Sequence, residues 1–323
     1  MPTAPKSKLG FSSRTEEVTV RSGPRLELRA FAPGKVIVLG EHAAVYGHPA
    51  LAAPLSRGVE AVAVRGKACE IAVPPELSEA QAVALQRAFK AGAAVFGSPR
   101  VRIEVKSDLP VSVGLGSSGA LSVAIARALA LAVKQTAPGR ILEGARAMEG
   151  EFHGQPSGVD HTTSARGEMV LFQRGKAKVV TGRKPVEVVV ALAGPRASTR
   201  STVAALRERQ AQWPKRYGRI FAEVGRLVKE GAAAVRAGEL ESLGDLMNLN
   251  HGLLTALGLA SESIDAMVRR LRSMGALGAK LTGAGGDGGA VIGLFREPEL
   301  IVKQLRARGI EAFASHLAGP RPL

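Results

Sequence analysis

The sequence predicts an α+β protein of two domains, and three observations support this prediction. Short apolar runs typical of β-strands alternate with helix-length amphipathic segments up to about residue 193. Beyond that point the pattern changes to long amphipathic helices, followed by strands around a glycine-rich segment. A chain of 323 residues is also long enough to bury two cores.

Taken in order, the patterns predict the following elements. Strands are expected at residues 26–31, 36–39, 59–64, 101–105, 169–172 and 186–192, with helices at about 78–95, 117–134 and 139–150. Helices at about 199–212, 220–237, 240–257 and 261–274 follow, then a strand pair around 280–295, a helix at 298–307 and a strand near 310–314. We expect residues 1–23 to form a flexible tail and the domains to span 24–194 and 195–323.

The composition indicates a cytoplasmic protein. Hydrophobic residues make up 46% of the chain and aromatic residues only 4%, which predicts a core of Ala, Val and Leu. No apolar run is long enough to span a bilayer, and the first residues lack the apolar segment of a secretory signal. The single cysteine, Cys69, excludes an internal disulfide framework and suggests a reducing compartment.

The net charge of +16 is compatible with nucleic-acid binding. The basic residues are scattered, however, without interleaved aromatic residues or a nucleic-acid-binding motif. A positive surface also attracts ATP and small acidic substrates. We therefore expect neither a nucleic-acid partner nor a membrane partner.

The segment GLGSSGALSVAIARALA, residues 114–130, places a glycine-rich loop directly before an apolar helix. Glycines let the backbone approach an anion, and the unpaired N–H groups of the first helical turn attract phosphate. The hydroxyls of Ser117 and Ser118 suit a helix cap, a phosphate contact or a Mg²⁺ ligand. Taken alone, the segment fits equally well a simple glycine turn with a serine N-cap.

Two further segments carry candidate functional residues. In APGKVIVLGEHAAVYGHPALAAPL, residues 32–55, an apolar run separates Lys35 from Glu41 and His42. In KLTGAGGDGGAVIGLF, residues 280–295, glycines separate two apolar stretches, which alone indicates a flexible hairpin loop.

In this order and spacing, the three segments resemble the motifs of the GHMP kinase superfamily, which includes galactokinase, homoserine kinase, mevalonate kinase and phosphomevalonate kinase. The mevalonate kinase motifs PGKVILxGEHAVVYG, GLGSSAA and KLTGAGGGGC look most similar. A fourth segment, EGEFHGQPSGVD at 149–160, is similar to that family's E followed by HGxPSGxD. The aspartate of the galactokinase motif GEHxDY is missing, which argues against galactose as substrate.

The resemblance implies an N-terminal domain like ribosomal protein S5 domain 2, a ferredoxin-like C-terminal domain and an active site between them. It also makes a homodimer plausible. The chain departs from the family motifs at Gly119, at His161, at Asp287 and at Gly289 or Ala290. We expect Asp287 to face solvent, because a carboxylate is unsuited to a loop near nucleotide phosphates.

Phosphoryl transfer requires a phosphate cradle, a divalent cation, a charge stabiliser and a group that orients the attacking hydroxyl. The predicted ATP-phosphate cradle consists of Gly114, Leu115, Gly116, Ser117, Ser118 and Gly119. Ser118 and Glu149 are the candidate Mg²⁺ ligands, through hard oxygen atoms. Asp160, expected on a loop, would accept the proton of the substrate hydroxyl. Lys35 would lie beside it, favour its ionised form and stabilise the transferring group.

The resemblance also implies the residues at the substrate: Lys35, Glu41, His42, Asp160, Thr199, Gly283 and Ala284. Thr199 fits a helix N-cap equally well. Taken alone, Glu149 and Asp160 fit solvated carboxylates, and only the position-by-position match of the fourth segment favours a function for them. His153 is expected to brace the loop that follows it.

These expectations predict ATP-dependent phosphorylation of the C5 hydroxyl of mevalonate, giving 5-phosphomevalonate and ADP for isoprenoid precursor synthesis. One alternative is a related GHMP kinase that acts on a relative of mevalonate. Another is a non-catalytic module, either an RNA binder or a metabolite sensor. The intact set Lys35, Ser118, Glu149 and Asp160 argues against a silent sensor.

Overall fold

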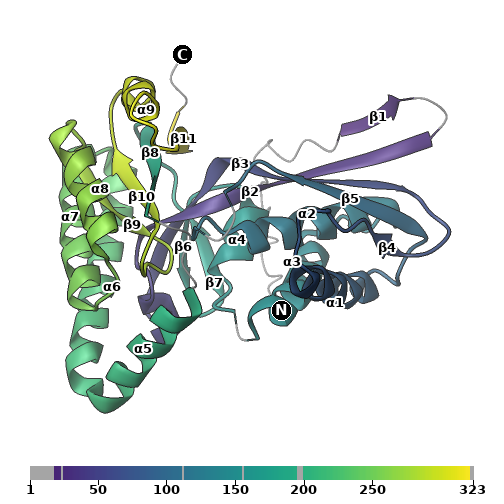
Figure 1. The fold of residues 1–323 in the computed structure, drawn as a ribbon, viewed down its shortest axis with the longest axis horizontal. Helices are drawn as coiled ribbons and strands as arrows, with labels where there is room; N and C mark the ends of the chain where they lie inside the picture. Colours follow the sequence, from purple (N-terminus) through teal and green to yellow (C-terminus); the bar gives the residue numbers. More distant parts are fainter. Residues whose placement is uncertain (1–17, 23–24, 111–112, 155, 195–198, 321–323) are drawn as a thin grey trace, which may run out of the picture.

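The computed structural model describes residues 18–22, 25–110, 113–154, 156–194 and 199–320. In this part of the chain, the N-terminal half builds a seven-stranded sheet in which β1-β2-β3-β5-β4 are neighbours and β6 and β7 extend from β3. The strands are β1 Val18–Ser22, β2 Arg25–Leu39, β3 Ala50–Arg65, β4 Glu70–Ile71, β5 Val101–Ser107, β6 Val170–Gln173 and β7 Lys176–Val179. The helical elements are η1 Ala43–Tyr46, α1 Glu79–Val95, α2 Ser117–Ala132, α3 Pro138–His153 and α4 Val159–Arg166. Helices α1 to α4 gather on one side of the long β2–β3 ribbon (Figure 1).

The C-terminal half builds a four-stranded antiparallel sheet in the order β11-β8-β10-β9. Its strands are β8 Val186–Ala193, β9 Gly278–Thr282, β10 Gly289–Leu294 and β11 Ala312–Ala318. Its helices are α5 Thr199–Gln212, α6 Pro214–Ala237, α7 Leu240–Ala256, α8 Glu262–Ser273 and α9 Pro298–Arg306. Helices α6, α7 and α8 run side by side, and the end of β2 reaches this half of the molecule (Figure 1).

Local sequence signals explain where several helices begin and end. Ser78 forms a capping box with Gln81 at the start of α1, and Ser261 caps α8 by accepting from the N–H of Ile264. Gly238 ends α6 in the left-handed conformation at φ 75°. Helix α2 is rich in alanine and buried along most of its length, as expected of a central helix that is apolar on all sides.

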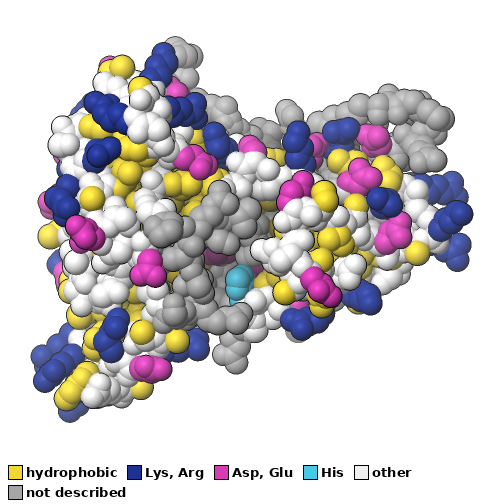
Figure 2. Space-filling model, in the orientation of Figure 1, with side chains coloured by type: hydrophobic (Ala, Val, Ile, Leu, Met, Phe, Trp, Pro, Cys, Tyr) yellow, Lys and Arg dark blue, Asp and Glu magenta, His cyan; other side chains and the backbone are white. Residues whose placement is uncertain are grey.

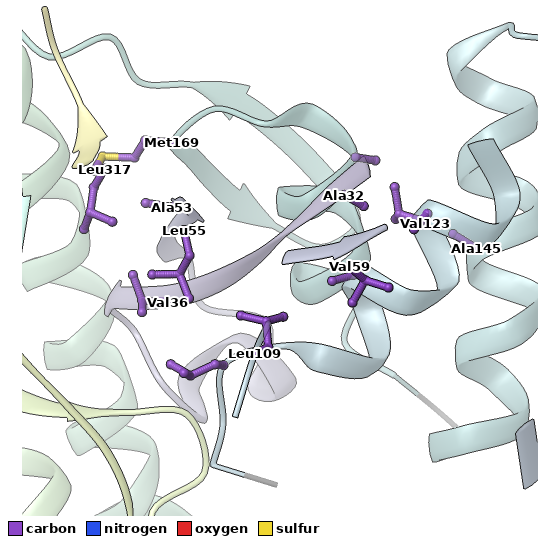
Figure 3. Packing of buried hydrophobic residues seen from close by; sticks show 14 of the residues in the cluster. Ala32, Val36, Ala53, Leu55, Val59, Leu109, Val123, Ala145, Met169 and Leu317 are labelled. Carbon is purple, nitrogen blue, oxygen red and sulfur yellow. The ribbon is translucent and has the colours of Figure 1, made fainter. Parts of the chain in front are cut away.

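One cluster of buried hydrophobic residues spans the two halves. Leu317 of β11 lies beside Met169, which precedes β6, while Val59 of β3 faces Val123 of α2 (Figure 3). The same cluster includes Val188 of β8. Burial of apolar surface therefore fixes the two sheets relative to each other, so that side chains from both halves meet in a defined geometry.

The prediction of an α+β chain is confirmed, with four local corrections. Residues 25–39 form one strand rather than two, so Lys35 lies within β2 at a bulge and not before the strand. Residues 18–22, which we expected in a flexible tail, pair with β2; residues 1–17 lie outside the described part. Asp160 lies in the first turn of α4 and not in a loop, because Gly158 at φ 89° starts a short helix.

The fourth correction concerns β8. We expected residues 186–192 in the N-terminal domain, but β8 pairs with β10 and β11 of the C-terminal sheet. Strand pairing thus divides the chain between β7 and β8, and we propose this position as the domain boundary in place of residues 194 and 195.

Candidate active site

The glycine-rich loop leads into α2 without a side-chain cap. The N-cap residue is Gly116, at φ 69°, and no side chain accepts a hydrogen bond at this helix end. The reading as a serine-capped turn is therefore wrong for Ser117 and Ser118, which belong to the first helical turn. Because no side chain caps the helix there, the site keeps the character of an anion cradle.

Lys35 is held against this loop by its backbone and by its side chain. Its N–H donates to the carbonyl of Leu115 at 2.9 Å, and its ammonium donates to the carbonyl of Gly114 at 3.2 Å. A Cβ on Gly116 would lie 2.7 Å from the Lys35 Cγ, so only glycine allows this close approach. The buried ammonium is thereby fixed next to the predicted phosphate cradle.

The Lys35 ammonium also reaches Asp160, with 3.2 Å between Nζ and Oδ1. The lysine side chain is 4% exposed and the aspartate side chain 34%, so the carboxylate lies where a substrate can reach it. Helix α4 is fastened near Lys35, because Ser164 donates to the carbonyl of Pro33 at 2.6 Å. The structure thus brings together the two residues that the sequence proposed as a pair, and their catalytic roles stay predictions.

Glu149, one turn before the end of α3, is 1% exposed and is therefore not a solvated surface carboxylate. Ser122 donates to its Oε1 at 3.4 Å, and Ser118 lies 3.0 Å from the Nε2 of His153. Burial, with a smaller effect of Asp160, raises the pKa of Glu149 to about 7, while Ser118, Ser122 and Lys35 act in the opposite direction. A cation bound between a buried carboxyl group and a second carboxylate would stabilise the ionised forms of both, so this position favours cation binding.

The chemistry of these donors fits Mg²⁺. Ser118 and Glu149 offer a hydroxyl and a carboxylate oxygen, the hard ligands that Mg²⁺ takes when phosphate oxygens and water complete its shell. Among the described residues, no group of three or more His, Cys, Asp or Glu side chains could hold a metal alone.

Glu41 follows the end of β2 and is fully buried, as is Lys280 of β9. The Lys280 ammonium contacts the Glu41 carboxylate and donates to the carbonyls of Leu281 at 2.6 Å and Ile37 at 3.4 Å. Burial raises the pKa of Glu41 and lowers the pKa of Lys280, while their mutual attraction opposes both shifts. We expected Glu41 at the substrate, but its carboxylate has no exposed surface from which to contact one.

His42 is only partly buried and lies in the left-handed region at φ 60°. Its Nε2 lies 3.0 Å from the carbonyl of Ala284, so Nε2 carries the proton and donates. Burial lowers the pKa of His42, and Lys35 lowers it further. The neutral ring therefore leaves Nδ1 as a hydrogen-bond acceptor.

The third glycine-rich segment packs directly on the first. A Cβ on Gly283 would lie 2.8 Å from the Cα of Gly114, so the two loops touch through backbone atoms. Ala284 contributes its carbonyl to His42. Asp287 is exposed, as predicted, and its own carbonyl accepts from Ser263 at 3.0 Å.

Gly119 and His161 are in contact, which the sequence analysis did not foresee. A Cβ at residue 119 would lie 2.9 Å from the backbone nitrogen of His161 and 3.0 Å from the Cβ of Asp160. The His161 side chain is 6% exposed, and its Nδ1 has no hydrogen-bond partner among the described residues. The glycine thus lets the turn that carries Asp160 lie close against α2.

The remaining predicted residue, Thr199, is the first residue of α5, but its side chain lies outside the described residues. Its role therefore stays a prediction. Sequence reasoning gave no role to Lys280 or Asn250, whose Oδ1 accepts from the N–H of Gly40 at 3.1 Å. Lys280 opens the third motif, but nothing in the sequence pairs it with Glu41, 239 residues away.

On the face shown in Figure 2, Lys and Arg side chains are spread over both halves rather than gathered into a band. A histidine side chain is visible in the hollow between the halves.

Family models match both halves of the chain. Residues 80–168 match the GHMP kinases N terminal domain, and residues 232–311 match the GHMP kinases C terminal domain. The mevalonate kinase of Aeropyrum pernix is 35% identical over 312 residues, which cover 89% of this chain and 93% of that protein. The mevalonate kinase of Pyrococcus furiosus is 32% identical over 295 residues, covering 81% and 88%.

Solved structures agree with these matches. The crystal structure of L. major mevalonate kinase in complex with R-mevalonate has a TM-score of 0.79 at 25% identity, covering 96% of this chain and 100% of that one. Lactococcus lactis galactokinase, solved with galactose, has a TM-score of 0.71 at 17% identity, covering 92% and 95%. The latter likeness concerns the fold alone.

The buried Glu149 carboxylate yields a stability prediction. Its pKa is raised from 4.5 to about 7, so the folded state holds a proton that the unfolded state releases. Ionisation of this buried carboxyl destabilises the folded state. The effect is absent below pH 4.5, grows as pH rises and is complete above pH 7, where it lowers the free energy of unfolding by about 3 kcal/mol. Without nucleotide, Glu149→Gln should therefore be more stable than wild type at pH 8 and similar at pH 5, measured by urea unfolding.

A matched control is Glu143→Gln on the same helix, whose side chain is 58% exposed and pairs with Arg140. Exposed pairs contribute about 0 to 1 kcal/mol, so this variant should show no comparable pH dependence. An equal stability difference at pH 5 and pH 8 for Glu149→Gln would contradict the prediction.

The contact at Gly119 yields a second prediction. Alanine gains about 1 kcal/mol of helix propensity, but overpacking costs about 1 to 3 kcal/mol, so Gly119→Ala should destabilise the protein. In the control Gly218→Ala, also within a helix, a Cβ meets nothing within 4 Å. That variant should be as stable as wild type or more stable in thermal unfolding, and equal effects of both changes would refute the crowding argument.

Proposed function

The chain belongs to the GHMP kinase family, and from this premise we propose that it transfers the γ-phosphoryl group of ATP to the C5 hydroxyl of mevalonate. The products are 5-phosphomevalonate and ADP, as in isoprenoid precursor synthesis. The observation that carries the proposal is the Lys35–Asp160 pair beside the uncapped end of α2, in a chain whose relatives over most of its length are mevalonate kinases.

The chain's own groups account for most requirements of phosphoryl transfer. The backbone of residues 114–119 and the N-terminus of α2 bind the ATP phosphates. The Asp160 carboxylate, partly exposed, accepts a hydrogen bond from the attacking hydroxyl and orients it. The Lys35 ammonium lies between Asp160 and the loop carbonyl of Gly114, where it stabilises charge on the transferring group.

Ser118 and Glu149 would hold Mg²⁺, which when bound neutralises charge on the β- and γ-phosphates. Holding the ion requires the ionised form of Glu149, and its pKa is about 7 in the absence of a cation. Protonation therefore competes with metal binding below neutral pH.

The substrate end is formed by His42 and the third glycine-rich loop. The neutral imidazole donates through Nε2 to Ala284 and offers Nδ1 to a substrate hydroxyl. Because galactokinase has the same fold, the fold does not determine which alcohol is the substrate, and the residues of the site must do so. A related GHMP kinase acting on another relative of mevalonate is therefore the alternative to test.

Location and assembly stay predictions. No helix in the described ranges is long and apolar enough to cross a membrane. Cys69 is free and partly buried, which is compatible with the cytoplasmic location that we propose. A homodimer remains plausible from the family.

The activity is tested by coupled ADP release with a panel of alcohols. We expect turnover with mevalonate and ATP, and none with galactose, homoserine or 5-phosphomevalonate. Turnover with one of the other alcohols and none with mevalonate would replace the proposed substrate. No ADP release with any of them would reject the kinase activity.

The pairing of Lys35 and Asp160 is tested by a double-mutant cycle. Asp160→Asn should lower turnover by about 10² or more while ATP binding survives, because the amide keeps the shape and removes the charge. Lys35→Met should also lower turnover, and the double variant should lose much less than the product of the two losses. Full multiplicativity at saturating ATP would show that the two groups act independently.

A further inference from the structure

Three consecutive residues after β2 are held by the C-terminal half of the molecule. The N–H of Gly40 donates to Asn250 of α7, the Glu41 carboxylate pairs with Lys280 of β9, and the His42 ring donates to the carbonyl of Ala284. We refer to residues 40–42 as the β2 turn. Its position is set by groups of the C-terminal half that lie 210 to 242 residues away in the sequence.

We propose that Lys280 is a positioning residue for the substrate end of the site, acting through Glu41 on the β2 turn and thereby on His42. This inference rests on the proposed function, because it assigns His42 to the alcohol substrate. Lys280 itself is fully buried, so it would act through its neighbours rather than by contacting a substrate.

The conformation of the β2 turn needs such support. His42 has φ 60° and Gly40 has φ 104°, and a non-glycine residue with such a φ is uncommon and strained. Strain of this kind persists only where the surroundings hold the backbone. Glu41 lies between these two residues, so a fixed Glu41 limits how far either can relax.

Lys280 is the group that fixes Glu41. Oε1 of this carboxylate meets the Lys280 ammonium, while Oε2 is buried without a hydrogen-bond partner in the described part of the chain. The ammonium is held in turn by the carbonyls of Ile37 and Leu281, on either side of the interface between β2 and β9. Loss of the ammonium would leave a buried carboxylate uncompensated, which costs far more than loss of a surface pair.

The second strand contact sets the register of this arrangement. Thr282, two residues after Lys280, accepts from the N–H of Ile37 at 2.9 Å and donates to its carbonyl at 3.1 Å. Thr282 therefore holds β2 against β9 without touching Glu41. Lys280 adds one longer contact to the same strand, at 3.4 Å to the carbonyl of Ile37. The two hydrogen bonds of Thr282 remain when Lys280 is replaced, so the placement of the turn can be altered by mutation while these strand contacts are kept.

The test compares the Michaelis constants of Lys280→Met for both substrates. Methionine keeps most of the side-chain length and removes the charge, so Glu41 loses its ion-pair partner. The Lys35–Asp160 pair and the phosphate loop are left unchanged. We expect the KM for mevalonate to rise about tenfold or more and the KM for ATP to change less than about threefold. His42→Ala should show the same selective rise.

The matched control is Ser315→Ala on β11. Ser315 is 2% exposed and accepts from the N–H of Ser56 on β3 at 2.9 Å, so it makes another, partly buried contact between the two sheets, at strands other than β2 and β9. It should lower the thermal midpoint without a selective change in either KM. A selective rise in this control equal to that of Lys280→Met would overturn the proposal, because any loosening of the interface would then suffice.

Glu41→Gln keeps the experiment decisive if Lys280→Met does not fold. The amide preserves the shape of the side chain and accepts from Lys280, but removes the charge that holds the pair together. It should show the same selectivity with a smaller rise, and Lys280→Met/Glu41→Gln should be no worse than Lys280→Met. A KM for mevalonate unchanged in Glu41→Gln, or equal rises in both constants, would overturn the positioning role.

The outcome is separable from that of the proposed function. If wild type uses another alcohol of the panel, the same comparison is made with that alcohol, and a selective rise still supports the role of Lys280. If wild type uses mevalonate and Lys280→Met binds it as wild type does, the proposed function stands and the inference fails. If wild type releases no ADP with any alcohol, both are rejected.

Discussion

The arrangement of the site depends on one strand that both sheets hold. Strand β2 pairs with β1 and β3 along its length, and its end is fastened to β9 through Thr282 and Lys280. Lys35 and His42 lie on this strand and on the turn that follows it. Lys35 is the residue proposed to act on the transferring group, and His42 is the one proposed to contact the substrate. Because a single strand and its following turn carry both, docking of β2 against β9 fixes the two residues relative to each other.

A second constraint is the contact between the two glycine-rich loops. Gly114 and Gly283 lie so close that a Cβ on either would press on backbone atoms of the other loop, at 3.1 Å and 2.8 Å respectively. Both residues have positive φ, at 85° and 87°. The glycines of the first and third segments are therefore required for the packing of loops from the two sheets, in addition to any approach of phosphate.

The sequence predicted the elements whose signals are local, and it missed those that depend on distant partners. Helix α4 was taken as a loop because Pro156 and Gly158 precede it and it is short, and β1 was missed because its pairing with β2 is not a local signal. The proximity of Lys35 and Asp160 came from the family motifs, not from periodicity. Lys280 received no role, because a lysine in a strand is usually exposed and its partner is 239 residues away.

The electrostatics of the site explain why a kinase tolerates these buried charges. Lys35 is the cation that acts on Glu149, while Asp160 and burial both oppose the ionised form of Glu149. One ammonium thus faces two carboxylates, and a full negative charge on both is disfavoured until further positive charge arrives. The metal ion of a bound metal–nucleotide complex would supply that charge at Ser118 and Glu149, so part of its binding free energy would offset the repulsion between the two carboxylates. In the proposed site, the carboxylate that is disfavoured as an anion in the free protein is the one that would hold the metal.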